Sequence, residues 1–171
     1  MNVKKLWIAV LVGMLLVLSL AGEAGARESA AVSAWKYVTI PAGHFHPIQD
    51  GYDWYNAGLS IRVSSGTGTF TAPVVFPGFG SVTVKKVILF TYDQNGTDDV
   101  SVSLYKTRPD SGTEVRIARA ESSGSAPGVR AFSNATIMGA TVYRSRGTYL
   151  WLNIPSSSNL EVYAVKIAYV D

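Results

Sequence analysis

Hydrophobic and polar residues alternate along most of the chain after residue 35. In "VSVSLY" (100–105), valine and leucine alternate with serine, and "LSIRV" (59–63) alternates in the same way. A period of two is typical of a β-strand with one buried face. The pattern therefore predicts strands, with Leu104 on the side that faces the core.

Similar runs, rich in Val, Ile, Thr and aromatic residues, recur between Gly, Pro, Asn and Ser. In the longest run, the Lys85-Lys86 pair interrupts the alternation, which predicts a β-bulge there. Pro73 cannot donate a backbone hydrogen bond, so its run is expected at a sheet edge or a bulge. The predicted strands are 35–40, 59–63, 69–76, 82–92, 100–105, 113–120, 134–143, 148–154 and 160–170.

These eight or nine strands, without a capped helical segment or an internal repeat, predict an all-β fold. Two packed antiparallel sheets are the stable way to bury one face of every strand. The strand number favours a jelly-roll-like β-sandwich. We expect a single domain over residues 35–171.

The N-terminus has the organisation of a secretory signal peptide. Lys4 and Lys5 precede an apolar stretch (6–20), and Ala24 and Ala26 form an A-x-A pattern, which predicts a signal peptide over residues 1–26. The apolar stretch is shorter than the ~20 residues of a membrane-spanning helix, so an uncleaved anchor is the less favoured alternative. We expect a secreted or periplasmic protein with a flexible segment at 27–34.

Composition narrows the function classes. The chain has no cysteine, so neither disulfides nor a lipid anchor on cysteine can contribute, and the hydrophobic core must supply the stability. The whole chain has 15 basic and 12 acidic side chains; without Lys4, Lys5 and Glu23 of the predicted signal peptide, 13 and 11 remain. This balance, with no run of Lys or Arg, argues against nucleic-acid binding.

Several motifs follow one another in a recognisable order. They are "IPAGHF" (40–45), "FTAPVVFP" (70–77), "VTVKKVILFTYD" (82–93), "DVSVSLYKT" (99–107) and "VKIAYV" (165–170). In this order the chain resembles a group of uncharacterised bacterial secreted β-sandwich proteins. The resemblance implies that the protein is exported and that it folds as a β-sandwich. It does not imply any particular activity. Separately, "GTFTAPV" (68–74) is similar to one strand of complement-type globular heads, which are also jelly rolls.

The stretch "YDQNGTDD" (92–99) has two interpretations. Asn-Gly favours a tight hairpin turn between the flanking strands, and this turn without metal is the favoured interpretation. The alternative is a calcium loop with oxygen ligands from Asp93, Asn95, Asp98 and Asp99. Its spacing departs from that of an EF-hand and lacks the terminal glutamate. The glycosylation triplets at Asn95 and Asn134 are interpreted as incidental.

An enzymatic site is not evident. His44 and His46 would point to the same side of an extended segment, as two metal ligands can. The chain has no third histidine, so a surface loop is favoured over a metal site. Carboxylates are present, but no spacing singles out a catalytic pair. We therefore expect a protein that is not an enzyme.

Two groups of aromatic residues are candidates for ligand binding. The connection 46–58 carries Tyr52, Asp53, Trp54 and Tyr55, and rings beside carboxylates suit sugar recognition. The favoured alternative is that these rings close the open end of the sandwich. Tyr149 and Trp151 alternate with three aliphatic residues and are expected on the outer face of their strand.

The sequence therefore predicts a non-catalytic extracellular module that binds carbohydrate or other cell-surface material. The alternative is a structural subunit of a surface layer, matrix or fibre that assembles through β-strand edges, including as a homo-oligomer. No cofactor is expected, apart from calcium in the alternative interpretation of residues 92–99.

Overall fold

The computed structural model describes residues 34–108 and 110–171, which form one compact unit, Ala34–Asp171. The predicted signal peptide and nearly all of the segment 27–34 lie outside the described residues. The elements are β1 (Lys36–Pro41), a 3₁₀ turn (Ala42–His44), β2 (His46–Pro47), β3 (Asp53–Asn56), β4 (Ile61–Ser65), β5 (Thr67–Pro73), β6 (Ser81–Asp93), β7 (Ser101–Arg108), β8 (Thr113–Glu121), β9 (Ala126–Asn134), β10 (Thr141–Tyr143), β11 (Thr148–Pro155) and β12 (Leu160–Val170).

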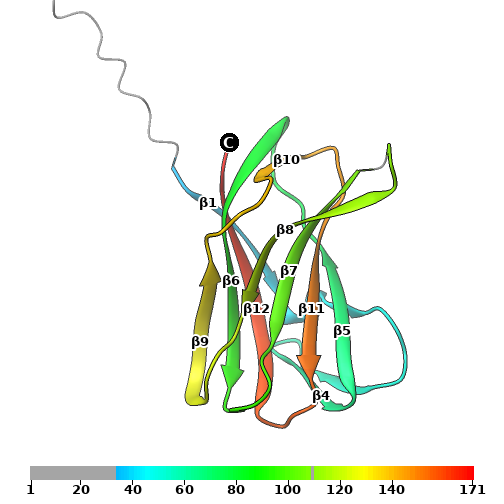
Figure 1. Cartoon of the computed structure of the whole chain (residues 1–171), viewed down its shortest axis with the longest axis vertical. Helices are drawn as coiled ribbons and strands as arrows, with labels where there is room; N and C mark the ends of the chain where they lie inside the picture. Colours follow the sequence, from blue (N-terminus) through cyan, green and yellow to red (C-terminus); the bar gives the residue numbers. More distant parts are fainter. Residues whose placement is uncertain (1–33, 109) are drawn as a thin grey trace, which may run out of the picture. The chain divides into compact units, whose positions relative to one another are not determined.

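The strands form two antiparallel sheets (Figure 1). The larger sheet has the order β10-β6-β12-β4-β3, with β1 paired to β12 and β9 paired to β6, and the smaller sheet has the order β2-β5-β11-β7-β8. Within them, β9-β6-β12-β4 and β5-β11-β7-β8 make an eight-stranded double sheet of the jelly-roll type. The prediction of a jelly-roll-like β-sandwich is confirmed.

Some predicted strand boundaries are wrong. The run predicted at 134–143 is the end of β9, a connection and the short β10. Asn134 interrupts it, because its side-chain amide donates to the Arg119 carbonyl at 2.6 Å and its Oδ1 accepts from the Thr136 amide at 2.6 Å. The sequence does not predict most of β9. This strand lies at the edge of the larger sheet and has no fully buried residue, so hydrophobic and polar positions do not alternate along it.

Two predicted irregularities are present. Lys86 lies opposite Ala168 and Val84 lies opposite Tyr169, so Lys85 is the extra residue of a β-bulge, as predicted. Pro73 ends β5 beyond the two residues at which β2 pairs with that strand. Its missing N–H therefore interrupts no pairing on that side.

The core lies between the sheets. Leu104, Leu150 and Leu152 of the smaller sheet are fully buried, as are Leu89 and Ile167 of the larger sheet. Leu104 thus points inward, as its alternation predicts. The described residues contain no helix long and apolar enough to cross a membrane.

Loops collect at the two ends of the sandwich (Figure 1). In this view the loop 74–80, strand β10, the β7–β8 turn and the C-terminus lie at the top, and we call this the upper end. The β6–β7 and β11–β12 loops lie at the bottom, which we call the lower end.

Candidate functional site

The outer face of the smaller sheet carries three aromatic rings. In β11, Leu150 and Leu152 are fully buried, whereas Tyr149 and Trp151 point to the opposite face and are partly exposed. Tyr105 on β7 lies opposite Tyr149 in the antiparallel register and therefore shares its face. We call Tyr105, Tyr149 and Trp151 the aromatic face.

The two tyrosine rings are nearly parallel. Their planes differ by 11° and their centroids are 5.5 Å apart. Parallel rings in direct face-to-face contact would be closer, so these two overlap only in part. Trp151 follows Tyr149 two residues along β11, about 6.6 Å away at the rise of a β-strand. The rings therefore lie together on the central strands of the sheet.

Polar side chains flank Trp151 in a row across the strands. Thr71 of β5 and Ser103 of β7 lie on either side of Trp151. His46 lies opposite Thr71, and Arg119 lies opposite Ser103. With strands about 4.8 Å apart, the row from His46 to Arg119 spans about 19 Å.

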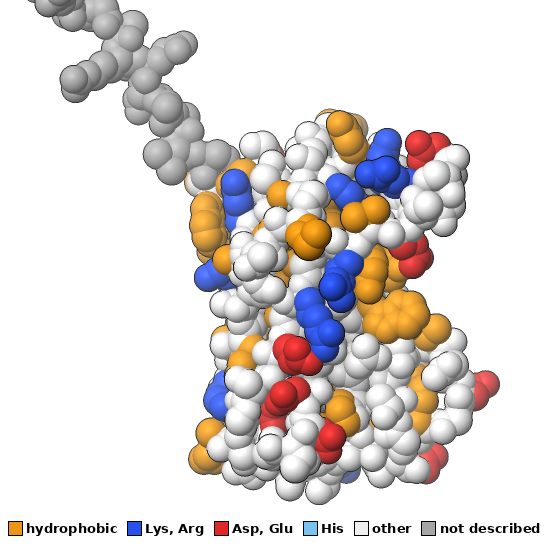
Figure 2. Space-filling model, viewed as in Figure 1, with side chains coloured by type: hydrophobic (Ala, Val, Ile, Leu, Met, Phe, Trp, Pro, Cys, Tyr) orange, Lys and Arg blue, Asp and Glu red, His pale blue; other side chains and the backbone are white. Residues whose placement is uncertain are grey.

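A second polar row lies beside the first. Asn153 is between Thr69 and Ser101, and the Thr69 Oγ1 donates to the Asn153 Oδ1 at 3.2 Å. Glu121 is opposite Ser101 and pairs with Arg119 at 2.5 Å. Figure 2 shows hydrophobic side chains beside β11 and β5 next to a column of Lys, Arg, Asp and Glu side chains over β7 and β8.

The Tyr149 hydroxyl is buried and has no hydrogen-bond partner among the described residues. Burial raises the pKa of Tyr149, and the nearby Glu114 carboxylate raises this pKa further, although it makes no hydrogen bond of normal geometry to the hydroxyl. The hydroxyl therefore stays protonated at neutral pH and keeps its proton for donation.

Tyr52 and Trp54, which the sequence analysis predicts as ligand-binding residues, lie outside the aromatic face. Both rings contact the buried Phe70 edge-on, each with a centroid distance of 5.5 Å. The Tyr52 hydroxyl donates to the Thr69 carbonyl at 2.6 Å, and burial raises the pKa of Tyr52. Trp54 is 39% exposed, so its ring covers the margin of the core while part of it faces solvent.

Asp53 and Tyr55 lie on β3 rather than in a long loop, and the expectation of a loop through these residues is wrong. β3 pairs with β4 at the edge of the larger sheet, where the Tyr55 ring lies 5.2 Å from the Arg62 guanidinium. Pairing with β4 satisfies the backbone hydrogen-bonding groups of this segment. The sequence did not predict this strand because Asp and Asn are typical of loops. The structure therefore does not join residues 52–55 to Tyr149 and Trp151, which lie on the smaller sheet.

The stretch 92–99 is not a hairpin turn. β6 belongs to the larger sheet and β7 to the smaller one, so the segment crosses from one sheet to the other. Its side chains hold its backbone: Asp93 Oδ1 accepts from the Asn95 amide at 3.0 Å, and Asn95 Oδ1 accepts from the Thr97 amide at 2.9 Å. The hairpin interpretation fails because Asn-Gly indicates a turn and not which strands pair.

Acidic side chains gather in this segment. Asp93 is fully buried, and its Oδ2 has no hydrogen-bond partner among the described residues. Burial, and then repulsion from Asp93, Glu121 and Asp98, raises the pKa of Asp99. Over residues 34–108 and 110–171, no group of three or more His, Cys, Asp or Glu side chains is arranged to hold a metal ion. Calcium binding by Asp93, Asn95, Asp98 and Asp99 stays a prediction.

The two histidines lie in different elements. His44 ends the 3₁₀ turn and His46 begins β2, and both are exposed. His46 shares the outer face of the smaller sheet with Trp151, as described above.

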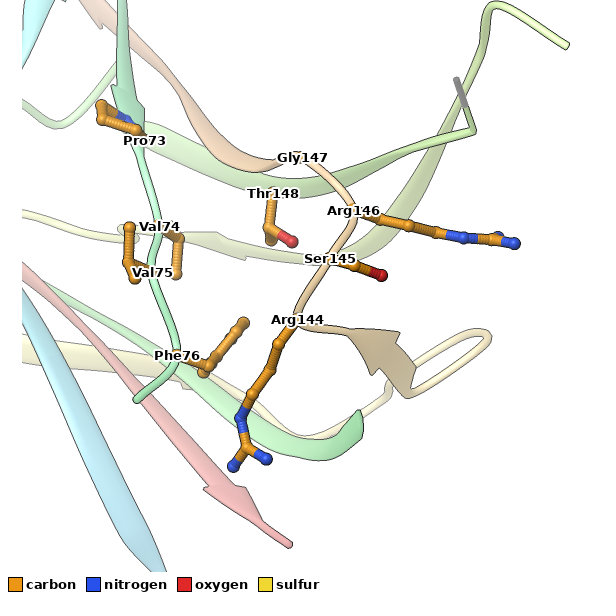
Figure 3. Close-up of a pocket in the computed structure, with 9 residues that line it drawn as sticks. All are labelled: Pro73, Val74, Val75, Phe76, Arg144, Ser145, Arg146, Gly147 and Thr148. Atoms are coloured by element: carbon orange, nitrogen blue, oxygen red, sulfur yellow. The ribbon is translucent and has the colours of Figure 1, made fainter. Parts of the chain in front are cut away.

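A pocket of about 340 Å³ lies at the upper end (Figure 3). It is lined by Pro73, Val74, Val75, Phe76, Arg144, Ser145, Arg146, Gly147 and Thr148. The lining contains two arginines and no carboxylate or histidine. It therefore lacks the acid–base pair that hydrolysis of a glycosidic bond requires.

Comparisons with known proteins identify no family for this chain. No protein-family model and no curated protein matches the chain. Of the resemblance to a group of bacterial secreted proteins, the two sheets of the structure support the β-sandwich architecture.

The solved structures it is similar to have several functions. A C-terminal family 6 carbohydrate-binding module of a laminarinase from Zobellia galactanivorans has 11% identity, a TM-score of 0.44, and covers 77% of this chain and 98% of its own. A carbohydrate-binding module of a Cellvibrio mixtus lichenase, in complex with cellotriose, has 12% identity, a TM-score of 0.38, and coverage of 76% and 95%. A tumour-necrosis-factor protein, Eiger from S. frugiperda, has 11% identity, a TM-score of 0.35, and coverage of 79% and 85%. These likenesses concern the fold alone.

Sequence reasoning missed Tyr105 as a member of the aromatic face. The same alternation that places Leu104 inward places Tyr105 outward, so a signal was present in "VSVSLY". What the sequence did not contain was the register that puts Tyr105 beside Tyr149.

Proposed function

We propose that this protein is an exported, non-catalytic module that binds carbohydrate through the aromatic face of its smaller sheet. The observation that carries the proposal is the grouping of Tyr105, Tyr149 and Trp151 on central strands, with polar side chains in rows beside them.

The arrangement matches the chemistry of a sugar. The C–H faces of a sugar ring are apolar and gain free energy when they stack on aromatic rings. Hydroxyl groups around the sugar ring need donors and acceptors, and Thr71, Ser103, Asn153 and Arg119 offer both kinds. An extended polysaccharide lying across the strands would meet the polar rows over most of its length.

Catalysis is not part of the proposal. The aromatic face is an open sheet surface, whereas most active sites are concave. Glu121, the acidic side chain in the second polar row, is paired with Arg119. Neither feature suits a general acid, which needs a protonated carboxyl group close to the scissile bond.

Retention on insoluble polysaccharides tests the proposal. We would measure the bound fraction on a panel of α- and β-linked glucans, xylan, chitin and peptidoglycan. Trp151→Ala should reduce retention at least about tenfold, which corresponds to the ~1.4 kcal/mol expected from losing part of a stacked ring. The melting temperature should change little because Trp151 lies outside the core.

Tyr55→Ala is the matched control, since it removes an exposed ring from the other sheet and should leave retention unchanged. Retention that is equal in Trp151→Ala, Tyr149→Ala and the unaltered protein would refute the aromatic face as the binding surface. Absence of retention on every polysaccharide of the panel would refute carbohydrate binding itself.

A further inference from the structure

The upper end of the sandwich presents a phenylalanine to solvent. Phe79 is 97% exposed and lies between Gly78 and Gly80, whose φ angles of 99° and 81° favour glycine. The Arg144 guanidinium donates to the Phe79 carbonyl and also pairs with Asp171. The backbone of this loop is therefore tied to the domain while the ring projects outward.

Two more apolar side chains are exposed beside Phe79. Val75 is 74% and Tyr143 is 51% exposed. A surface pocket of about 370 Å³ lined by Phe79 and Tyr143 shares Arg144 and Ser145 with the pocket that Val75 lines. The three side chains thus line two neighbouring pockets that have Arg144 and Ser145 in common. Exposed apolar groups that gather in this way usually mark an interaction site.

Cationic side chains stand next to these apolar groups. Lys106 Nζ donates to the carbonyls of Gly139 and Thr141 at 2.8 and 2.9 Å, which brings β7 close to β10. Burial lowers the pKa of Lys106, and repulsion from Arg108 and Arg146 lowers this pKa further. Among the described residues, none of these three cations forms an ion pair with an acidic side chain.

The acidic groups on this end are few. Asp171 pairs with Lys36 and Arg144, Asp110 lies in the β7–β8 turn, and Glu114 lies opposite Thr107 near the start of β8. The acidic segment 93–99 lies at the opposite, lower end. The domain is therefore polarised, and its positive end is the one that carries the exposed apolar side chains (Figure 2).

We propose that the upper end docks on an anionic lipid bilayer, with Phe79, Val75 and Tyr143 entering the interface and Arg108 and Arg146 facing the lipid phosphates. Apolar and aromatic side chains surrounded by Lys and Arg have the composition of a surface that binds in the headgroup region. Each cation adds attraction to a negatively charged leaflet. Figure 3 shows Arg146 pointing away from the pocket, and its guanidinium lies 5.0 Å from the centroid of the exposed Tyr143 ring.

The start of the described chain agrees with this orientation. Ala34 precedes Lys36, which pairs with Asp171 at the upper end. The apolar stretch predicted to engage the export membrane ends at Leu20, fourteen residues before Ala34. Whether that stretch is removed or retained, the chain enters the domain at the end proposed to face the lipid.

Vesicle co-sedimentation tests the proposal. The chain from Arg27, which contains every buried core residue of the described domain, excludes a contribution from the apolar stretch 6–20. We expect it to bind phosphatidylcholine vesicles that contain phosphatidylglycerol, and to bind pure phosphatidylcholine far less. Phe79→Ala should weaken binding about tenfold, and Arg146→Glu together with Arg108→Glu should remove the preference for anionic lipid.

Leu59→Ala is the matched control. Leu59 is 80% exposed and lies in the β3–β4 turn. Ile61, two positions after Leu59, lies opposite Val162 of β12, and Val162 lies opposite Thr91 of β6. Thr91 is ten residues along β6 from Ser81, which is at the upper end, so about 33 Å of strand separates Thr91 from that end. Leu59→Ala should bind vesicles like the unaltered protein, and so should Trp151→Ala, which separates lipid binding from carbohydrate binding.

Equal sedimentation of Phe79→Ala and the unaltered chain would overturn the proposal. A dimer detected by light scattering would also overturn the proposal if Phe79→Ala dissociated it. The exposed side chains would then be covered by a second copy of the chain. Because the Phe79 side chain is exposed, Phe79→Ala should leave the melting curve unchanged. An unchanged melting curve would show that a loss of vesicle binding does not come from unfolding.

Discussion

Tyr105 and Tyr149 come from neighbouring strands of the smaller sheet, and their rings lie nearly parallel with centroids 5.5 Å apart. They are separated by 44 positions in the chain, and only the pairing of β7 with β11 makes them neighbours. This pair, with Trp151, gives the outer face of the sheet an apolar surface on which the proposed carbohydrate binding depends.

Tyr149→Phe should change the alkaline stability of the protein. The pKa of Tyr149 is raised in the folded state, so the folded protein keeps this proton when the unfolded chain, with a pKa near 10, releases it. The stability that Tyr149 contributes is fully present below pH ~10 and is lost as the pH rises toward the folded-state pKa. The variant should therefore lose less stability than the unaltered protein above pH ~10.

Thermal melts between pH 7 and 11 measure this difference. At pH 7, Tyr149→Phe should be as stable as the unaltered protein or slightly more stable, because it removes a buried hydroxyl without a partner. Tyr143→Phe, at an exposed position, is the control. Parallel pH curves for all three proteins would contradict the assignment.

Trp54→Ala should lower stability and leave carbohydrate retention intact. The Trp54 ring contacts Phe70 at the margin of the core, and it is 39% exposed, so we expect a loss of about 1–3 kcal/mol, below that of a fully buried tryptophan. Urea unfolding and polysaccharide retention should be measured on the same sample. Lost retention with unchanged stability would return the binding site to residues 52–55.

Leu104→Ala should destabilise the domain by about 2–5 kcal/mol, because Leu104 is fully buried between the sheets and the variant leaves a cavity. Ser103→Ala, at the next position on the opposite face of β7, should change the free energy of unfolding by less than about 0.5 kcal/mol. Urea unfolding of both variants is the measurement. Similar losses in the two would show that burial on β7 does not alternate.

Asp99→Asn should raise the melting temperature slightly at pH 7. The folded-state pKa of Asp99 is raised, so stability is highest below the unfolded-state pKa of about 3.9 and is lost as the pH rises through the folded-state pKa. Removing the charge removes that loss, and the advantage of the variant should disappear below pH ~4.

Melting curves with millimolar calcium and with chelator test the remaining interpretation of residues 93–99. Calcium bound there would neutralise the repulsion around Asp99, so it should raise the melting temperature of the unaltered protein and have a smaller effect on Asp99→Asn. Equal melting temperatures in calcium and chelator would exclude the calcium loop.

The sequence by itself determined the fold class and the facing of individual side chains. Alternation placed Leu104 and Leu150 inward and Trp151 outward, and the Lys85-Lys86 pair marked a bulge, because side-chain direction along a strand depends only on local geometry. The absence of cysteine likewise fixed the hydrophobic core as the source of stability.

Only the tertiary structure decided which strands are neighbours. It showed that residues 92–99 cross between sheets, that Trp54 packs on Phe70, and that Tyr105 lies beside Tyr149. The physical reason is that a period of two specifies a buried face without specifying the strand beside it. Pairing is selected by the burial of the whole core, and residues far apart in the chain contribute to it jointly.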